Sequence, residues 1–511
     1  MSHNPLEEHL LRLTRRQFVG KAATGFSAGM GITALASMLN NSAHAAAPLL
    51  PGSGTLGNPH VAPKAKRVIY LHMMGGPSQL DLWDHKPGLE EHRGKDLRSD
   101  EFKHLYNNQR ITGMTSGQST LPIANSIFKF NKADNGGDGV WMSELLPHTA
   151  SVANELCVIK SMYTEAINHE PGVTYLQTGS QIPGRPSMGA WLSYGLGSMN
   201  ENLPSFVVLI SKGVGNMQAL SDRLWGSGFL PSEHQGIRFR GGAEPVLFLK
   251  DPKGVTRDDR RKMLDATAKL NEMAFNESLD PEVNARIAQG EMAYRMQMSV
   301  PELTDFSDED EATVEMYGPD VKKPGTYANN CLLARRMAER DVRFIQLYHR
   351  GWDQHGNLPR DIRGQAKQID QPQAALIKDL RRRGLLDDTL VVWGGEFGRG
   401  VYSQGALSNT NYGRDHHPRC FTMFMAGGGS KPGTVFGETD MLGYNIVDKD
   451  GMPLTKLDQH YTHPDACHIH DLHATMLDLM GVDHERLTFR FQGRRYRLTD
   501  IEGRKMKPLM S

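Results

Sequence analysis

Six short and largely continuous apolar runs constrain the fold of this chain most strongly. They cover residues 67–72, 157–162, 206–210, 342–348, 389–393 and 420–426. Continuous apolar strands indicate burial on both faces of a sheet. Amphipathic stretches that predict helices lie between them, at 143–156, 186–197, 327–340, 366–384 and 471–480. This alternation predicts an α/β fold, a three-layer αβα sandwich with a mostly parallel central sheet.

The N-terminal residues 1–45 have the pattern of a twin-arginine signal peptide. Arg15 and Arg16 precede a mildly apolar Ala/Gly-rich stretch, and Ala43-His44-Ala45 offers small residues for signal peptidase. Residues 46–64 are rich in Pro, Gly and Ala and indicate a linker. We therefore expect recognition by the twin-arginine export machinery and a periplasmic or extracytoplasmic location. No apolar run is long enough to predict a stable membrane span.

Residues 65–511 are expected to form the folded domain, with residues 212–326 as a largely helical insertion at one edge of the sheet. Without residues 1–45, the chain has 54 basic and 56 acidic side chains, which argues against nucleic-acid binding. The four cysteines, Cys157, Cys331, Cys420 and Cys467, are far apart and contain no CxxC pair. This pattern excludes a disulfide framework, although a single disulfide stays open.

Polar clusters follow the predicted strands, where ligands bind in open α/β sheets. Four of them are Gly75–Ser78, Asn168–Gly172, Trp352–Asn357 and Gly394–Arg399. A fifth, Gly413–Pro418, precedes strand 420–426 and reaches the same rim if that strand runs antiparallel. We therefore expect five distant segments to meet at one edge of the sheet.

The residue types in these clusters indicate a metal site next to anion-binding groups. The expected metal ligands are Asp353, His355, Glu396 and His416, and the ion is zinc, manganese or calcium. His169 is the candidate catalytic residue, with a helix cap as the alternative. The candidate anion-binding residues are Arg350, Arg399 and Arg414. Asp353 as a capping residue and His416-His417 as a surface turn are the plainer alternatives, and His468 and His470 stay open.

Longer motifs resemble a known family. RVIYLHMMGGPSQLDLWDHKPG, NHEPGVTYLQTG, WDQHGN, GGEFGR, GRDHHPRCFTMFMAGGG and HDLHATMLDLMGVDHERLTFRFQGR are similar to the bacterial domain-of-unknown-function family fifteen-oh-one. Members of that family are commonly labelled sulfatase-like and placed in the alkaline phosphatase superfamily. The resemblance implies an alkaline phosphatase-like fold, with a metal-assisted attack on phosphate or sulfate esters.

The resemblance also assigns positions, and several depart from the superfamily pattern. Glu396 stands for a bridging Asp, Phe397 stands where His or Asn is a ligand, and His416 fits a ligand His. His169 replaces the usual Ser, Thr or Cys nucleophile. Asp353 and His355 are two residues apart instead of four, and the first strand ends in Met74-Gly75-Gly76 instead of Asp. These departures imply a single-metal or degenerate site. No cysteine has the context that formylglycine sulfatases require.

Two functions follow as hypotheses. The first is an exported hydrolase that uses one metal ion to cleave a small anionic ester or a sulfated or phosphorylated glycan, with water activated by the metal as the attacking group. Within that hypothesis, His169 could instead attack as a nucleophile or act as a general acid. The second is a non-catalytic anion- or glycan-binding protein, or an envelope assembly protein, that reuses the fold.

Overall fold

The computed structural model describes residues 54–106, 118–242, 244–246, 251, 253–278, 281–460 and 462–511. The predicted export signal, residues 1–45, and the first part of the predicted linker lie outside these residues. None of the described helices is long and apolar enough to cross a membrane.

A nine-stranded sheet forms the centre of the fold, and it is mostly parallel. The strand order is β12-β4-β11-β8-β1-β7-β5-β6, and β15 also pairs with β4. Its strands are β1 (Arg67–Met74), β4 (Leu156–Tyr163), β5 (Phe206–Lys212), β6 (Ile237–Phe239), β7 (Phe344–Arg350), β8 (Thr389–Gly394), β11 (Phe421–Ala426), β12 (Thr434–Phe436) and β15 (Cys467–His468). All six predicted strands are present in this sheet.

Strand β11 is the one strand of this sheet that runs against its neighbours. It pairs antiparallel with both β4 and β8. The segment before β11 therefore lies at the same rim as the segments that follow β1, β7 and β8, as convergence of the polar clusters requires.

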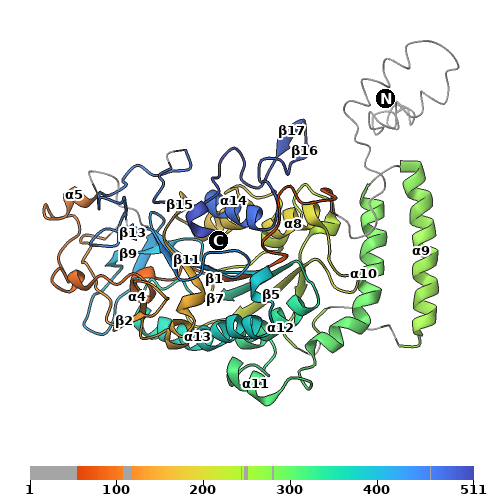
Figure 1. The fold of residues 1–511 in the computed structure, drawn as a ribbon, viewed down its shortest axis with the longest axis horizontal. Coiled ribbons are helices and arrows are strands. Elements are labelled where there is room, and N and C mark those ends of the chain that lie inside the picture. The colour runs from red at the N-terminus through yellow and green to blue at the C-terminus, as the bar shows by residue number, and fades with distance from the viewer. Residues whose placement is uncertain are drawn as a thin grey trace, which may run out of the picture. The chain divides into compact units, whose positions relative to one another are not determined.

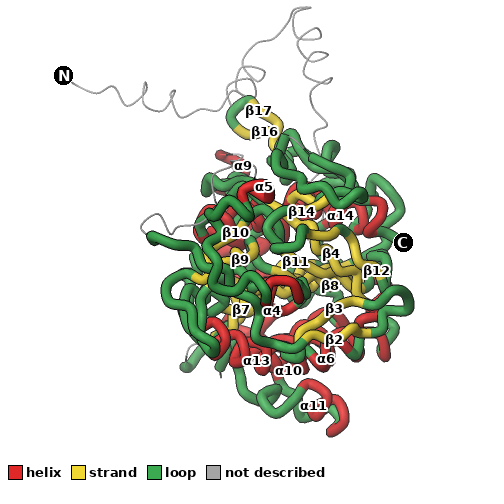
Figure 2. The backbone as a smooth tube through the Cα atoms, turned by 90° about the vertical axis from the view of Figure 1, so that its left-hand side faces the viewer, coloured by secondary structure: helices red, strands yellow, loops and turns green. Residues whose placement is uncertain are grey.

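Helices cover both faces of the sheet, as the predicted three-layer sandwich requires (Figure 1). One face packs against α12 (Tyr327–Glu339) and α13 (Leu358–Arg382) in an apolar core that includes Ile345 and Leu347. The other face packs against α7 (His169–Thr178), α8 (Met188–Leu196) and α14 (Ile469–Leu479). Figure 2 shows α14 on one side of strands β4, β8 and β11, with α6 (Pro147–Ala150) and α13 on the other. Burial on both faces explains why these strands are continuously apolar.

Short helices and two-stranded ladders lie outside the central sheet. The short helices are α4 (Gln79–Leu82), α5 (Lys103–Tyr106) and α11 (Glu311–Tyr317). Four two-stranded ladders pair β2 (Phe130–Ala133) with β3 (Val140–Ser143), β9 (Gly398–Ser403) with β10 (Arg414–His417), β13 (Glu438–Thr439) with β14 (Ile446–Val447), and β16 (Phe489–Phe491) with β17 (Arg494–Tyr496). The β9–β10 ladder carries three of the candidate site residues, Arg399, Arg414 and His416.

The expected insertion, residues 212–326, holds both helices and a strand. Strand β6 extends the central sheet at its edge by pairing parallel with β5. Helices α9 (Arg257–Ser278) and α10 (Pro281–Thr304) follow. Residues 251–291 belong to a second compact unit, in which the Arg261 guanidinium donates a 2.8 Å hydrogen bond to Glu291.

The predicted helix over 143–156 is wrong. This stretch forms the end of β3, the single turn α6 and a 3-10 turn at Ala153–Glu155. The carboxylate of Asp370 accepts hydrogen bonds from the backbone amides of His148 and Thr149, each 2.8 Å long. These bonds fix one short turn on α13 in place of a longer helix.

Candidate metal centre

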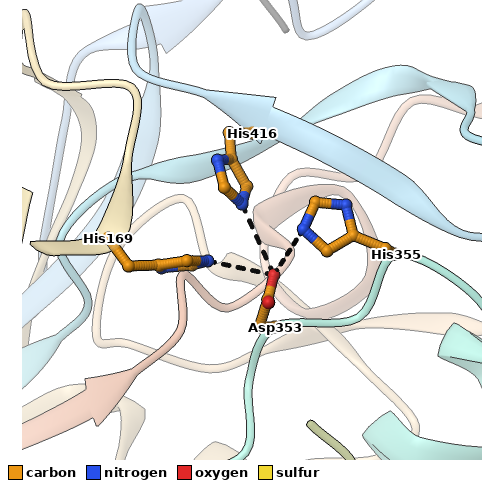
Figure 3. A group of neighbouring side chains, drawn as sticks. All are labelled: His169, Asp353, His355 and His416. Carbon is orange, nitrogen blue, oxygen red and sulfur yellow. Dashed lines mark hydrogen bonds and ion pairs between the residues drawn. The ribbon is translucent and has the colours of Figure 1, made fainter. Parts of the chain in front are cut away.

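Four side chains from three distant segments meet at the rim where β1, β7 and β8 end. Asp353 and His355 follow β7, His169 is the first residue of α7, and His416 lies on β10. One ligand atom from each side chain lies within 4.8 Å of the other three. Figure 3 shows the three imidazoles directed at the Asp353 carboxylate.

The three histidines present the same ring nitrogen to the same carboxylate oxygen. The Nε2 atoms of His355, His169 and His416 are 2.7, 3.0 and 3.4 Å from Asp353 Oδ1. Three imidazole nitrogens and one carboxylate oxygen around a common point form the donor set of a divalent transition-metal site.

The opposite ring nitrogen of each histidine faces a hydrogen-bond acceptor. The Nδ1 atom of His169 is 2.6 Å from Glu396 Oε1, and that of His416 is 2.6 Å from the Ile167 carbonyl oxygen. The Nδ1 atom of His355 pairs with Gln404 Oε1. Since a carbonyl or carboxylate oxygen accepts, each Nδ1 donates, which makes Nε2 the nitrogen that would bind a metal ion. Burial acts to lower the pKa of His169, but its hydrogen bonds with Asp353 and Glu396 raise that pKa.

The Asp353 carboxylate is held on both oxygens. Arg399 donates to Oδ1 over 2.8 Å, while the side-chain amides of Asn216 and Gln218 donate to Oδ2 over 2.8 and 2.5 Å. Burial acts to raise the pKa of Asp353, but the three imidazoles and Arg399 hold that pKa far below its usual range. The carboxylate is therefore ionised and fixed in orientation.

Glu396 lies behind His169 and outside the group of four converging ligand atoms. Its carboxylate accepts from His169 Nδ1 and, over 3.0 and 3.2 Å, from the Gly75 backbone amide. His72 Nε2 is 3.6 Å from Glu396 Oε2. Burial lowers the pKa of His72 to about 4, so this imidazole is neutral at pH 7. Glu396 was expected to be a metal ligand. Its carboxylate instead contacts Nδ1 of His169, the ring nitrogen on the side away from Asp353.

Two groups set the shape of the site. Gly75 has a φ of 120°, and a Cβ atom at this position would lie 2.5 Å from the Asp353 backbone nitrogen. Glycine therefore allows the end of β1 to approach the loop after β7. The buried Phe397 ring lies 4.9 Å from the His169 ring and 4.6 Å from the His416 ring, between centroids. This ring packs against both imidazoles, at the position where the resemblance implied a His or Asn ligand.

The four side chains of the group differ in their exposure to solvent. The side chain of His355 is 32% exposed, while those of Asp353 and His416 are 4% and 3% exposed. Because His416 is so little exposed, burial lowers its pKa to about 4, and its ring is neutral at pH 7. His355 is therefore the most exposed of the four side chains.

The three arginines expected to bind an anion differ in their surroundings. Arg399 is buried and donates to Asp353 and to the backbone oxygens of Gly76 and Arg414. Arg414 is buried against Asp81, with Nε 2.6 Å from Oδ2. Arg350 is half-buried and donates to the Gln218 carbonyl oxygen. The structure therefore brings only Arg399 to the four ligand atoms, and its hydrogen bonds are directed into the protein.

Other residues near the candidate centre were missed in the sequence. Asn216, Gln218 and Gln404 contact the ligands. Asn216 and Gln218 lie in the loop after the predicted strand β5, which was not considered as a source of site residues, and Gln404 follows β9, which was not predicted. His468 and His470, whose role in the site the sequence left undecided, lie at the start of α14. His468 Nε2 is 3.1 Å from Glu165, and its Nδ1 accepts from the His470 amide, which caps this helix. All four cysteines are buried and free.

Solved structures similar to this chain include a lipoteichoic acid synthase, a sulfatase and an alkaline phosphatase. The lipoteichoic acid synthase LtaP from Listeria monocytogenes is 10% identical, with 88% of this chain and 80% of that chain covered and a TM-score of 0.35. The PsFucS1 sulfatase from Pseudoalteromonas sp. is 14% identical, with 72% and 66% covered and a TM-score of 0.31. The alkaline phosphatase from the Antarctic bacterium TAB5 is 10% identical, with 71% and 92% covered and a TM-score of 0.28.

The chain spans just under two thirds of the length of the Pseudoalteromonas sulfatase. At these identities and scores, the similarities give no basis for assigning an activity. No curated protein sequence matches the chain. The profile of the family described as "Protein of unknown function (DUF1501)" matches residues 65–510. The family expected from the motifs is confirmed: the chain belongs to the DUF1501 family.

Proposed function

We propose that this protein is a hydrolase of phosphate or sulfate esters that depends on one divalent metal ion, held by His169, Asp353, His355 and His416. The observation that carries the proposal is the common orientation of the three imidazole rings. Three Nε2 atoms converge on one carboxylate oxygen, while each Nδ1 faces its own acceptor. A cluster of histidines that served only packing would have no need for this common orientation.

The donor set selects among the expected ions. Calcium prefers six to eight oxygen ligands, whereas this site offers three nitrogens and one carboxylate. Zinc and manganese both accept imidazole and carboxylate together. We therefore propose zinc or manganese and exclude calcium from the proposal.

The charge of such a site suits an anionic ester. A bound dication with one carboxylate ligand carries a net positive charge, and the Glu396 and Arg399 charges next to it cancel. When bound, an ion of this kind lowers the pKa of a coordinated water and polarises an ester oxygen. The exposed side at His355 is where the ester and the water would enter.

The proposal changes the roles that the sequence suggested for His169, a catalytic residue, and Glu396, a metal ligand. Both ring nitrogens of His169 are directed at carboxylates, so we assign this residue as a ligand rather than as a nucleophile. We assign Glu396 as the group that orients His169.

Export remains part of the proposal. The twin-arginine motif at Arg15-Arg16 supports translocation of a folded protein with its metal bound, to the periplasm or another extracytoplasmic location. The substrate would then be a small anionic ester or a sulfated or phosphorylated glycan outside the cytoplasm.

Elemental analysis of the purified full chain, followed by a panel of phosphate and sulfate esters, tests this function. We expect about one zinc or manganese per chain, and turnover that is lost with the metal in His416→Ala. The matched control is His473→Gln, because His473 is a buried histidine outside the group. Metal without turnover on any ester would favour the binding-protein alternative, and absence of metal would contradict both the site and the reaction.

A further inference from the structure

A second charged site lies beside the candidate metal centre, at the ends of β5 and β7. It is a pocket of about 450 Å³, and its lining includes Lys212, Arg238, Arg350 and the first residues of α12. Asp320 is the one acidic residue in the lining, and it pairs with Lys323 over 2.6 Å. We call this site the cationic pocket.

The sheet brings the three cations together. Lys212 is the direct partner of Arg350 across the β5–β7 ladder. Arg238 pairs with Val208, which is four positions before Lys212 on β5. Because side chains alternate along a strand, an even spacing places all three on the same face of the sheet.

These positive charges are not neutralised within the described part of the chain. Lys212 and Arg238 form no ion pair there, and Arg350 donates through Nε and Nη2 to the Gln218 carbonyl oxygen only. Burial and the nearby Arg238 lower the pKa of Arg350. Helix α12, 13 residues long, begins at the pocket wall, so the positive end of its dipole adds to the same charge.

One residue joins the pocket to the candidate metal centre. Gln218 accepts from Arg350 through its backbone oxygen and donates to Asp353 Oδ2 through its side chain. Two residues, Gly351 and Trp352, lie between Arg350 and Asp353 along the chain, so the Cα atoms of Arg350 and Asp353 are at most about 11 Å apart. With Gln218 in contact with both, the cationic pocket and the candidate metal centre are adjacent.

We infer that the cationic pocket binds a second phosphate or sulfate group of the substrate, while the ester to be cleaved lies at the metal centre. This inference rests on the proposed function and narrows its substrate class to esters with at least two anionic groups. Lys212 and Arg238 supply the charge, and Arg350 links the pocket to the loop that carries Asp353 and His355.

Calorimetric titration of the metal-loaded full chain at low salt tests the inference with probes that cannot be hydrolysed. The probes are hexane-1,6-bisphosphonate and hexylphosphonate, which differ only in the second anionic group. We expect the bisphosphonate to bind at least about tenfold more tightly, because its second contact is intramolecular. In the double variant Lys212→Gln, Arg238→Gln, both exposed positions, this preference should disappear.

Arg490→Gln is the matched control, because Arg490 is also the exposed middle residue of a three-residue strand and does not line the pocket. It should keep the preference. A wild-type chain that binds both probes equally would overturn the inference, and so would a preference that survives in the double variant.

Two further measurements separate this inference from the proposed function. Elemental analysis reports the metal, and the difference in inorganic-phosphate binding between the wild type and the double variant reports the pocket. If the chain holds no metal but the double variant loses phosphate binding about tenfold, the proposed function fails while the pocket remains an anion site. Phosphate binding without a bisphosphonate preference in metal-loaded protein would identify a site for free anions and overturn the role in substrate binding.

Discussion

At the scale of single residues, each imidazole of the candidate centre has two distinct sides. The Nε2 side faces Asp353, and the Nδ1 side faces an acceptor that is different for each ring: Glu396, Gln404 or a backbone carbonyl. Because the two sides differ, mutations can distinguish a residue that binds the metal from a residue that only orients a ligand.

Glu396→Gln should weaken metal binding without abolishing it. The amide keeps the size of the side chain but loses the charge that holds His169, and such changes cost about 10–100-fold in metal affinity. His416→Ala removes a ligand and should lose far more. Competition with a chelator measures both affinities. If Glu396→Gln lost the metal as fully as His416→Ala, Glu396 would be a ligand after all.

His473→Gln should make the chain less sensitive to acid. Burial lowers the pKa of His473 to about 4, and its Nε2 donates to the Leu176 carbonyl oxygen. Between pH 6.5 and 4 the unfolded chain therefore binds a proton that the folded chain does not, so stability falls as pH falls, by at most about 1.4 kcal/mol per pH unit. Above pH 6.5 this penalty is absent.

Chemical unfolding of wild type and His473→Gln at several pH values measures this slope. The glutamine can donate to the same carbonyl but cannot titrate, so the variant should show a shallower loss of stability between pH 6 and 4.5. Equal slopes would mean that His473 titrates alike in the folded and unfolded chain.

The sequence predicted the neighbourhood of these residues better than their contacts. Glu396 and His169 were both expected at one rim because each follows a predicted strand, and the structure places them there. Which oxygen or nitrogen meets which partner depends on side-chain reach across strands, and one sequence carries no signal of that. Gln404 and Gln218 were missed for the same reason, since their partners lie 49 and 135 residues away.

At the scale of elements, the candidate centre depends on how closely the end of β1 approaches the loop after β7. Trp352 donates its amide to the Met74 carbonyl oxygen over 3.1 Å, and Gly75 follows directly. The same glycine donates to Glu396. One backbone segment thus positions the loop that carries Asp353 and the carboxylate behind His169.

Gly75→Ala should disturb both stability and metal binding. The left-handed φ costs about 1–2 kcal/mol for any side chain, and the close backbone atoms of Trp352 and Asp353 add about 1–3 kcal/mol. Gly94→Ala is the matched control, because Gly94 has a φ of 83° with no atom near its Cβ position. Thermal unfolding and metal content should both be worse in Gly75→Ala, and equal effects would contradict the close approach.

The strands of the central sheet were predictable because burial on both faces leaves an apolar run. The β9–β10 ladder was not, since Arg399, Arg414 and His416 lie in it as polar residues that are buried by long-range pairing. Strand β6 has only three residues and gives little pattern. The stretch 143–156 has a helical pattern, but contacts with Asp370 determine its structure.

At the scale of the whole molecule, buried ion pairs join distant parts of the chain. Asp81 on α4 pairs with Arg414 on β10 and also accepts from Ser78 and Tyr412, each over 2.5 Å. Burial acts to raise the pKa of Asp81, but Arg414 and these hydroxyls lower it below its usual value. Its contribution to stability is therefore present at neutral pH and is lost only as pH falls through that lowered pKa.

Asp81→Asn should reduce the free energy of unfolding by about 3–5 kcal/mol, because it leaves the buried Arg414 charge without a partner. The double variant Asp81→Asn, Arg414→Met removes both charges and should recover part of that loss. Urea unfolding of the three proteins at pH 7 measures the effect. A double variant less stable than the single one would show that the unpaired Arg414 charge is not the cause of the loss.

The central claim is that three histidines and one aspartate share a metal ion, and X-ray absorption at the metal edge tests it most directly. The purified full chain, loaded with zinc, should show three imidazole nitrogens at about 2.0–2.1 Å and one carboxylate oxygen. His169→Ala should reduce the count to two imidazoles, whereas His473→Gln should leave it at three. A spectrum with no imidazole ligands, or one unchanged by His169→Ala, would contradict the shared metal ion.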